Sequence, residues 1–430
     1  MGNYRALKKL AICLFVCFSL QAQSTPDELL SRVRKEITES VSRAPNYTCT
    51  ETMSRVTYWP TAAVSSGCDN NREAPDSAMV LKSKDRLRLD VGVSGANEIF
   101  SWHGEKSFNE GDITRLVGYG NISSGTFSSF LDAVFTRTDA RFQFERDSTQ
   151  GGREVVVFSY IMPREKSGWE INGPDAKAVV GFQGRFVVDS ETASLVAFSI
   201  ESVDLSRLID SYCAVRISTE YHKVQLGSST FVLPQRVTTV MLARGGVKAK
   251  AETEYSSCQQ FVGESSLRFD EADSPAAPAP ASKPETDLPA GLTLRVRLAS
   301  TINPDSSWVG DPVEGLLEEP LYGAKHELLA SKRARVLGRL VRLQSVEQPA
   351  RRLEVAFDWR RIDAGATIYR FAAHRQGAAN PDAQNLFDAP VSAQDEVPSQ
   401  TFFFKGDHHK VDASFVSLWI TETPRTLRKP

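Results

Sequence analysis

One stretch of the chain cannot contribute to a hydrophobic core, and it divides the sequence in two. Residues 270–291 read DEADSPAAPAPASKPETDLPAG, with five prolines and no apolar periodicity. This composition is typical of a semi-rigid, polyproline-like spacer. We therefore expect a Pro/Ala-rich linker at residues 270–290 that joins a first domain of residues 23–269 to a second domain of residues 291–430.

The N-terminal segment has the pattern of an export signal. Three basic residues among the first nine precede an apolar run over residues 10–20, and the small residue Ala22 follows. A positive start, a short apolar core and a small residue at the cut are typical of a cleaved signal peptide, and the run is too short for a comfortable membrane span. We expect residues 1–22 to be a signal peptide that directs the chain to the periplasm or the outer membrane; an uncleaved anchor is the alternative.

Four cysteines remain after the signal peptide, namely Cys49, Cys68, Cys213 and Cys258. They contain no CxxC pair and have no histidine at ligand spacing, so the pattern predicts no metal site. A catalytic thiol is disfavoured because an oxidising compartment tends to consume it. Four cysteines in an exported chain predict two disulfides.

Sequence spacing favours the pair Cys49–Cys68, because these residues flank one short excursion of the chain. That choice leaves the pair Cys213–Cys258, which the expected strand geometry disfavours. In a simple meander these two cysteines lie roughly 35 Å apart along the strands, far beyond bridging range. Either a bend intervenes before residue 219, or the second pairing is wrong.

Composition agrees with a folded, exported protein. Hydrophobic residues make up 41% of the chain and charged residues 24%, close to globular averages. The formal net charge is −2, and removal of the three signal-peptide cations leaves the mature chain near −5. A net negative chain argues against a nucleic-acid partner.

The first domain reads as one helix, a shorter second helix and many antiparallel strands. Thr25 to Glu28 form a capping box with proline at the first helical position, and apolar residues then recur at helical spacing until Pro45. A second helix is expected near residues 126–137. Alternating patterns and intervening turn residues predict strands, at 85–91, 97–108, 141–161, 184–202, 214–226, 230–243 and 247–261.

The fold class predicted for the chain is mainly β, with an α+β first domain. One helix, "PNYTC" leading into long strands, and the hairpin "GRFVVDSETASLVAF" resemble the outer-membrane lipoprotein carrier superfamily (LolA/LppX-like) over residues 25–270. The resemblance implies an unclosed half-barrel of curved antiparallel sheet, covering helices, and a hydrophobic cavity for acyl chains or a lipidated partner. Two disulfides and an appended domain depart from the pattern of the carriers.

The second domain is predicted to be a small β-barrel. Alternating segments begin at Leu294 and recur at residues 352–359, 367–371 and 413–420. The short pieces Gly291, Gly310-Asp311, Gly338-Arg339 and Arg351-Arg352 resemble the β-barrel domain of TrbI-type scaffold proteins of type IV secretion. We expect this barrel to dock to another component of the envelope while the first domain binds its ligand.

No catalytic motif is present, and we predict no catalytic residue and no cofactor. HExxH, GxSxG, SxxK and Walker patterns do not occur. Asp407, His408 and His409 are the one local cluster with metal-like composition. Neighbouring strand residues point to opposite faces, so we interpret the cluster as solvated surface.

Two sets of residues are the candidates for binding. Aromatic and aliphatic residues in the middle of the first domain serve either as plain core or as the wall of a ligand cavity: Phe100, Trp102, Phe127, Phe130, Leu131, Phe135, Phe142 and Phe144. Arginines in the second domain form either a solvated barrel face or a site for an anionic envelope component: Arg333, Arg335, Arg339, Arg351 and Arg352.

The function expected from these features is non-enzymatic. We predict an exported bacterial envelope protein that binds a lipid, an acyl chain or a lipidated partner through a hydrophobic concave face. The alternative is an envelope hydrolase whose site is assembled from scattered carboxylates.

Overall fold

The computed structural model describes residues 25–423 except 62–67, 69–72, 96, 106–107, 109–112, 118–119, 123, 138, 262–282, 377–399 and 407–409. The predicted signal peptide, most of the predicted linker and the Asp407–His409 cluster lie outside the described residues. Within them, no helix is both long enough and apolar enough to cross a membrane.

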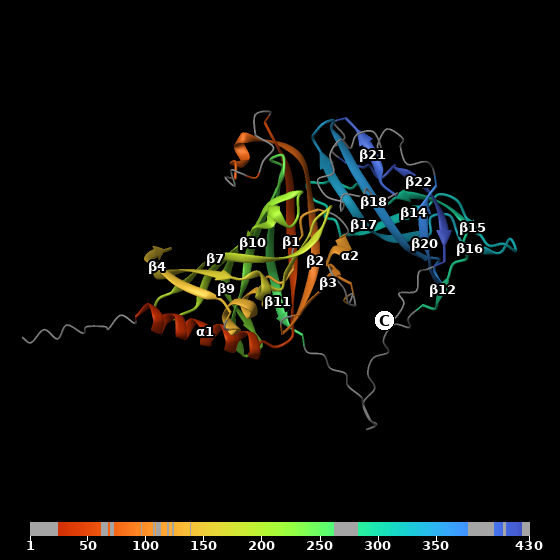
Figure 1. Ribbon diagram of the computed structural model, residues 1–430. Helices are drawn as coiled ribbons and strands as arrows, with labels where there is room; N and C mark the ends of the chain where they lie inside the picture. The colour runs from red at the N-terminus through yellow and green to blue at the C-terminus, as the bar shows by residue number, and fades with distance from the viewer. Residues whose placement is uncertain are drawn as a thin grey trace, which may run out of the picture.

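The first part of the chain is a curved antiparallel sheet (Figure 1). Its strand order is β4-β5-β7-β8-β9-β10-β11-β1-β2-β3, with β6 added to the start of β7. The strands are β1 (Tyr47–Pro60), β2 (Met79–Ser94), β3 (Asn97–Trp102), β4 (Arg141–Gln150), β5 (Arg153–Met162), β6 (Trp169–Asn172), β7 (Lys177–Asp189), β8 (Leu195–Val203), β9 (Tyr212–Leu226), β10 (Ser229–Ala243) and β11 (Lys248–Gln260).

Few helical segments accompany this sheet. Helix α1 (Pro26–Arg43) has the predicted capping box at Thr25 and buries Leu29, Val33 and Ile37. The expected second helix is shorter, with α3 (Ser129–Leu131) followed by a single π turn, η2 (Asp132–Thr136). The remaining segments are α2 (Ile113–Val117), α4 (Arg164–Ser167), η1 (Asp76–Ala78) and η3 (Leu205–Arg207).

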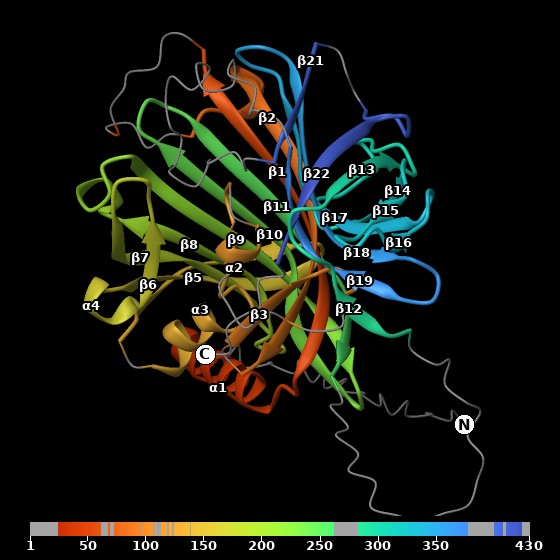
Figure 2. The ribbon, with the colours of Figure 1, turned by 90° about the vertical axis from the view of Figure 1, so that its right-hand side faces the viewer.

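The second part is also built from antiparallel strands (Figure 2). Strands pair in the order β20-β22-β13-β14-β17-β18; β19 and β21 both pair with β18, and β12 lies parallel to β19. They are β12 (Glu285–Asp287), β13 (Thr293–Leu298), β14 (Pro312–Leu317), β17 (Arg335–Val346), β18 (Arg352–Asp363), β19 (Ile368–Arg370), β20 (Ala372–Arg375), β21 (Phe402–Lys405) and β22 (Val416–Glu422), with a separate hairpin of β15 (Leu321–Tyr322) and β16 (Leu328–Ala330). The predicted fold class, mainly antiparallel β with a large curved sheet and few helices, is confirmed.

The two parts are joined more closely than a linker alone suggests. Strand β17 pairs with the segment of β2 that β3 leaves open, so that Gln344 lies opposite Asp85. A second junction is formed by Val309, whose backbone N–H donates to the Arg86 carbonyl (2.8 Å) and whose carbonyl accepts from the Arg88 N–H (2.9 Å). The Arg86 guanidinium lies 3.6 Å from the centre of the Trp308 ring.

Both disulfide pairings expected from sequence spacing are wrong, although all four cysteines are oxidised. The bonds join Cys49 to Cys258 and Cys68 to Cys213, with Cα–Cα distances of 4.1 and 5.3 Å. A simple meander was assumed, but β1 inserts between β2 and β11. Cys49 therefore lies opposite Cys258, at the register shift between the pairs Thr48↔Gln259 and Thr50↔Ser256.

The second bond follows from the same strand order. Tyr58 near the end of β1 pairs with Lys248, Lys248 pairs with Leu242, and Leu242 pairs with Ala214. One row across four strands thus brings the end of β1 level with Cys213. The excursion that carries Cys68 starts close to this row, so Cys68 can reach Cys213 at the start of β9.

Candidate functional site

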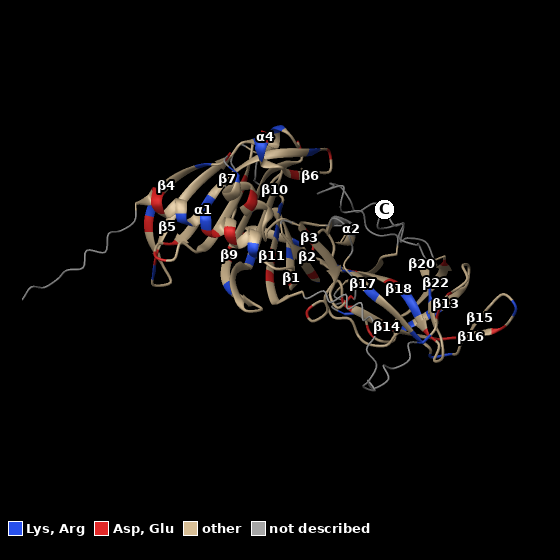
Figure 3. Ribbon diagram, turned by 90° about the horizontal axis from the view of Figure 1, so that it is seen from below, with Lys and Arg blue, Asp and Glu red and all other residues tan. Residues whose placement is uncertain are grey.

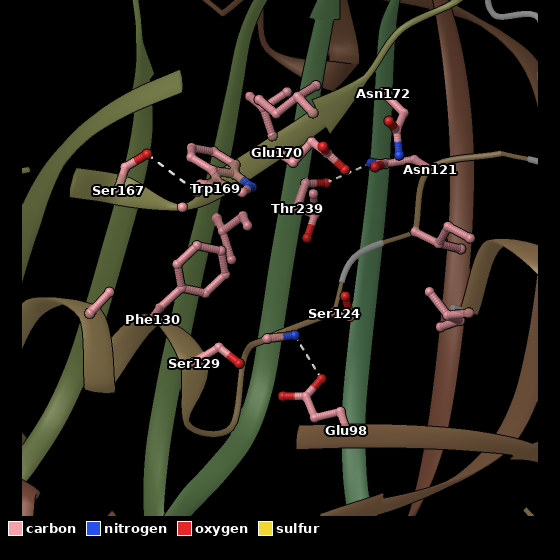
Figure 4. Close-up of a pocket in the computed structure, with 18 of the residues that line it drawn as sticks. Glu98, Asn121, Ser124, Ser129, Phe130, Ser167, Trp169, Glu170, Asn172 and Thr239 are labelled. Carbon is pink, nitrogen blue, oxygen red and sulfur yellow. Dashed lines mark hydrogen bonds between the residues drawn. The ribbon is translucent and has the colours of Figure 1, made fainter. Parts of the chain in front are cut away.

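A cavity of about 890 Å³ lies between the curved sheet and the segments that cover it. Strands β9 and β10 supply Val215, Ile217 and Thr239 to its floor, while β3, α3 and β6 form its walls. Figure 4 shows the labelled side chains from these elements arranged around one open space. This volume falls within the range of about 300–1,000 Å³ that is typical of small-molecule sites.

Local sequence explains how β6 reaches the cavity. Gly168 takes a left-handed conformation (φ 65°) after α4, and the chain then pairs with the start of β7. The Ser167 hydroxyl accepts from the Trp169 N–H (3.2 Å) and donates to the Val180 carbonyl. Trp169, Glu170 and Asn172 consequently line the cavity, and Trp169 packs edge-on against Phe130 with 5.7 Å between ring centres.

Glu98 is a carboxylate in the wall of the cavity. Its two oxygens accept from the Gly125 N–H (2.7 Å) and the Phe127 N–H (2.9 Å), which anchors the loop that leads into α3. Burial raises the pKa of Glu98, and the two backbone donors only partly offset this effect. The carboxylate therefore shapes the cavity by holding residues 124–128 in place.

A second carboxyl group lies deeper in the sheet. Glu51 on β1 is 1% exposed and lies opposite Tyr255 of β11. Neither of its oxygens has a hydrogen-bond partner among the residues that the structure describes. Burial, with a smaller contribution from the negative charge of Glu98, raises its pKa to about 8. Glu51 is accordingly neutral at pH 7.

The eight predicted cavity residues separate into several environments. Phe100 and Phe130 line the 890 Å³ cavity, whereas Phe127 and Leu131 line a small void of about 70 Å³ beneath α1. Phe135 and Phe142 belong to the packed aromatic core, where Phe135 meets Phe186 at 5.0 Å between ring centres.

The other two aromatic candidates do not line the cavity. Trp102 contacts the second part of the chain, since a Cβ added to Gly310 would lie 2.8 Å from its ring. Phe144 is 38% exposed on β4, at the free edge of the sheet.

The predicted arginine candidates do not form one open cationic patch. Arg335 pairs with Glu314 (2.7 Å), Arg351 with Glu347 (3.0 Å) and Arg352 with Glu354 (2.7 Å). Arg339 is buried between the two parts, where it pairs with Glu105 (2.6 Å). Arg333 is exposed in a turn at φ 69°. Basic and acidic residues alternate over the ribbon (Figure 3), and an anionic partner for this region stays a prediction.

Sequence reasoning missed the polar half of the cavity lining. Glu98, Asn121, Trp169 and Glu170 come from segments that are distant in the chain, and none stands in a recognised motif. A local signal existed for two of them, since "SGWEING" places a tryptophan and an acid on a short strand beside a glycine. The segment alone does not predict that these side chains line a cavity.

Comparison with known proteins shows distant likenesses only. No protein-family model and no curated protein matches the chain. Among solved structures, a LolA superfamily protein from Nitrosomonas europaea is 11% identical and covers 56% of this chain and 94% of its own, with a TM-score of 0.25. A DUF1329 family protein from Desulfovibrio piger is 8% identical, covers 57% and 98%, and has a TM-score of 0.28.

The lipoprotein LppX of Mycobacterium tuberculosis is 11% identical and covers 56% of this chain and 99% of its own, with a TM-score of 0.22. These matches fall in the first part of the chain, where the sequence resembles the LolA/LppX-like superfamily. At such TM-scores they carry no argument about function. They do not test the TrbI-type resemblance of residues 291–430, which stays a prediction.

Proposed function

We propose that this chain is a non-enzymatic envelope protein whose first part binds a lipid or a lipidated partner in the 890 Å³ cavity. The observation that carries the proposal is the cavity itself, which combines apolar walls at Phe100, Phe130 and Trp169 with hydrogen-bonding groups at Glu98 and Asn121. Mixed walls of this kind suit an amphipathic ligand, because chain and headgroup each find matching surface.

The compartment agrees with this role. Two disulfides are typical of proteins that work in an oxidising space such as the periplasm. Together with the signal-peptide pattern of residues 1–22, they support an exported protein.

The hydrolase alternative has less support from the geometry. The two acids that line the cavity already have structural partners, since Glu98 accepts two backbone N–H groups and Glu170 pairs with Lys177 at 2.7 Å. Among the described residues, no group of three or more histidines, cysteines or acids is placed to hold a metal ion.

A variant that fills the cavity tests the proposal. Val215 lies on the cavity floor, so Val215→Trp should occupy the space without burying a charge. Wild-type protein is expected to bind a fluorescent fatty-acid probe, and Val215→Trp to weaken that binding by about tenfold or more. Ile161→Trp is the matched control, because Ile161 is 53% exposed and does not line the cavity.

Mass spectrometry of the purified full-length protein gives an independent measurement. A co-purifying amphiphile that is lost from Val215→Trp and kept in Ile161→Trp would support the cavity as the site. Equal probe binding by both variants and the wild type would contradict it.

A further inference from the structure

Glu98 in the cavity wall has hydrogen-bonding capacity left for a ligand. Glu98 has accepted one backbone N–H at each carboxylate oxygen, and each oxygen can accept another hydrogen bond. Among the described residues, no Lys, Arg or His forms an ion pair with this carboxylate.

Two of the donors in the wall, on Asn121 and Ser167, are already used. Asn121 donates its side-chain amide to the Thr239 carbonyl (3.2 Å) and the Ala249 carbonyl (3.3 Å), which leaves its carbonyl oxygen as the group that it can offer a ligand. The Ser167 hydroxyl donates to the Val180 carbonyl. Figure 4 shows the bond from Asn121 to Thr239 at one side of the cavity and Glu98 at the other.

Charge in the wall points the same way. Among the described residues, Arg137 is the one basic residue that lines the cavity, and it is half-exposed and pairs with Asp132 at 3.4 Å. Among the residues that the structure describes, the Glu98 carboxylate is therefore the charge in the wall without a cationic partner, since Glu170, the other acid there, pairs with Lys177. An anionic headgroup would be repelled here, whereas a cationic donor would form a charge-assisted hydrogen bond with Glu98.

Resting on the proposed function, we infer that the ligand of this cavity carries an ammonium group, which the Glu98 carboxylate binds. Glu98 then has two roles, since it anchors residues 124–128 through their backbone and selects the headgroup by charge. The apolar walls at Phe130 and Trp169 hold the hydrocarbon part of the same molecule.

The test compares three probes of equal chain length, namely decylammonium, decanol and decanoate, bound to the oxidised full-length protein and measured by calorimetry. Decylammonium should bind about tenfold more tightly than decanol, and decanoate more weakly than both. Glu98→Gln should bring the affinities for decylammonium and decanol to within about twofold. Glu220→Gln, an equal charge change at an exposed position of β9 outside the cavity, should leave the preference intact.

Glu98 also supports the loop, so a second variant separates the two roles. Ser124→Lys places a cation in the same wall without removing the backbone bonds of Glu98, and it should abolish or reverse the preference for decylammonium. Decanoate binding as tightly as decylammonium would overturn the inference, as would a preference that survives both variants. If decanol and both ions all fail to bind, the cavity is not a lipid site and the proposed function falls with the inference.

Discussion

Glu51 shows how a single residue can couple folding to pH. Its carboxyl group is buried at 1% exposure, and its pKa is raised from 4.5 to about 8. The folded chain thus retains a proton that the unfolded chain releases above about pH 4.5. The stability contributed by the protonated group is complete below that pH and is lost progressively as the pH rises through about 8.

Replacing Glu51 by Gln should remove this dependence. The fall in the free energy of unfolding between pH 5 and pH 9 is expected to be smaller in Glu51→Gln by on the order of 4 kcal/mol. Denaturant unfolding at a series of pH values measures this difference. The change of the free energy of unfolding with pH is the quantity to compare, because a buried amide without partners also lowers the free energy of unfolding at every pH. Exposed Glu220→Gln is the control, and parallel profiles for Glu51→Gln and the wild type would refute the assignment.

Phe130 lies between the packed aromatic core and the cavity. Its ring meets those of Trp169 and Phe182 at 5.7 and 5.9 Å, while its other side faces the open space. Phe130→Asp should lower the free energy of unfolding by about 3 kcal/mol or more, because it exchanges this packing for a charge. Phe144→Asp, at an exposed edge position, should cost less than about 1 kcal/mol, and equal losses in the two variants would contradict this placement of Phe130.

At the scale of elements, strand β1 organises the first part of the molecule. It pairs with β2 from its first residue to its last, Tyr47 to Pro60, and with β11 from Tyr47 to Tyr58. It also carries Glu51, Arg55 and Cys49 on the same face, and Arg55 forms a buried ion pair with Asp85. Both disulfides tie this strand or its following loop to strands that come much later in the chain.

Peptide mapping without reduction should recover the pairs Cys49–Cys258 and Cys68–Cys213. Recovery of Cys49–Cys68 would contradict the position of β1 between β2 and β11. Substituting serine at both Cys49 and Cys258 should lower the free energy of unfolding by about 2–5 kcal/mol, because the bond closes a separation of 209 residues. The thermal unfolding midpoint of the double variant, compared with that of the wild type, measures this loss.

At the scale of the whole molecule, the junction between the two parts is a continuous sheet with an ion pair. Strand β17 continues the sheet from β2, and buried Arg339 binds Glu105 as well as the carbonyls of His103 and Gly310. Two parts held in this way are expected to stay together after the chain between them is cut.

Limited proteolysis should cut between residues 270 and 284, because that sequence has the composition of a proline-rich spacer, whereas β12 pairs with β19 and Leu288 is buried. The two fragments should then co-elute in gel filtration. Arg339→Glu should separate them, because truncating a buried charge pair costs about 2–5 kcal/mol and the new acid faces Glu105. Arg335→Glu on the same strand, where the arginine is exposed, is the control; cuts scattered through both parts would contradict the two-part organisation.

The sequence by itself determined the local features of this protein. The capping box at Thr25, the hairpin turn at residues 189–194 and the alternation along β2 and β9 depend on neighbouring residues, whose types are visible in the chain. Oxidation of the four cysteines was likewise predictable from their number and the export signal. These features predicted a mainly antiparallel β fold with one long helix.

Only the tertiary structure decided which strands are neighbours, and this order controls the rest. Alternation predicts which residues share a face of a strand, but it does not predict the neighbouring strand. The sequence therefore could not predict that β1 lies between β2 and β11, and it could not predict the two disulfide pairings that follow from this order. The cavity is hidden for the same reason, because its wall collects residues from Asn97 to Met241. Glu98 and Asn121 are ordinary polar residues in the sequence, and they become a site only where the curved sheet brings them to face one space.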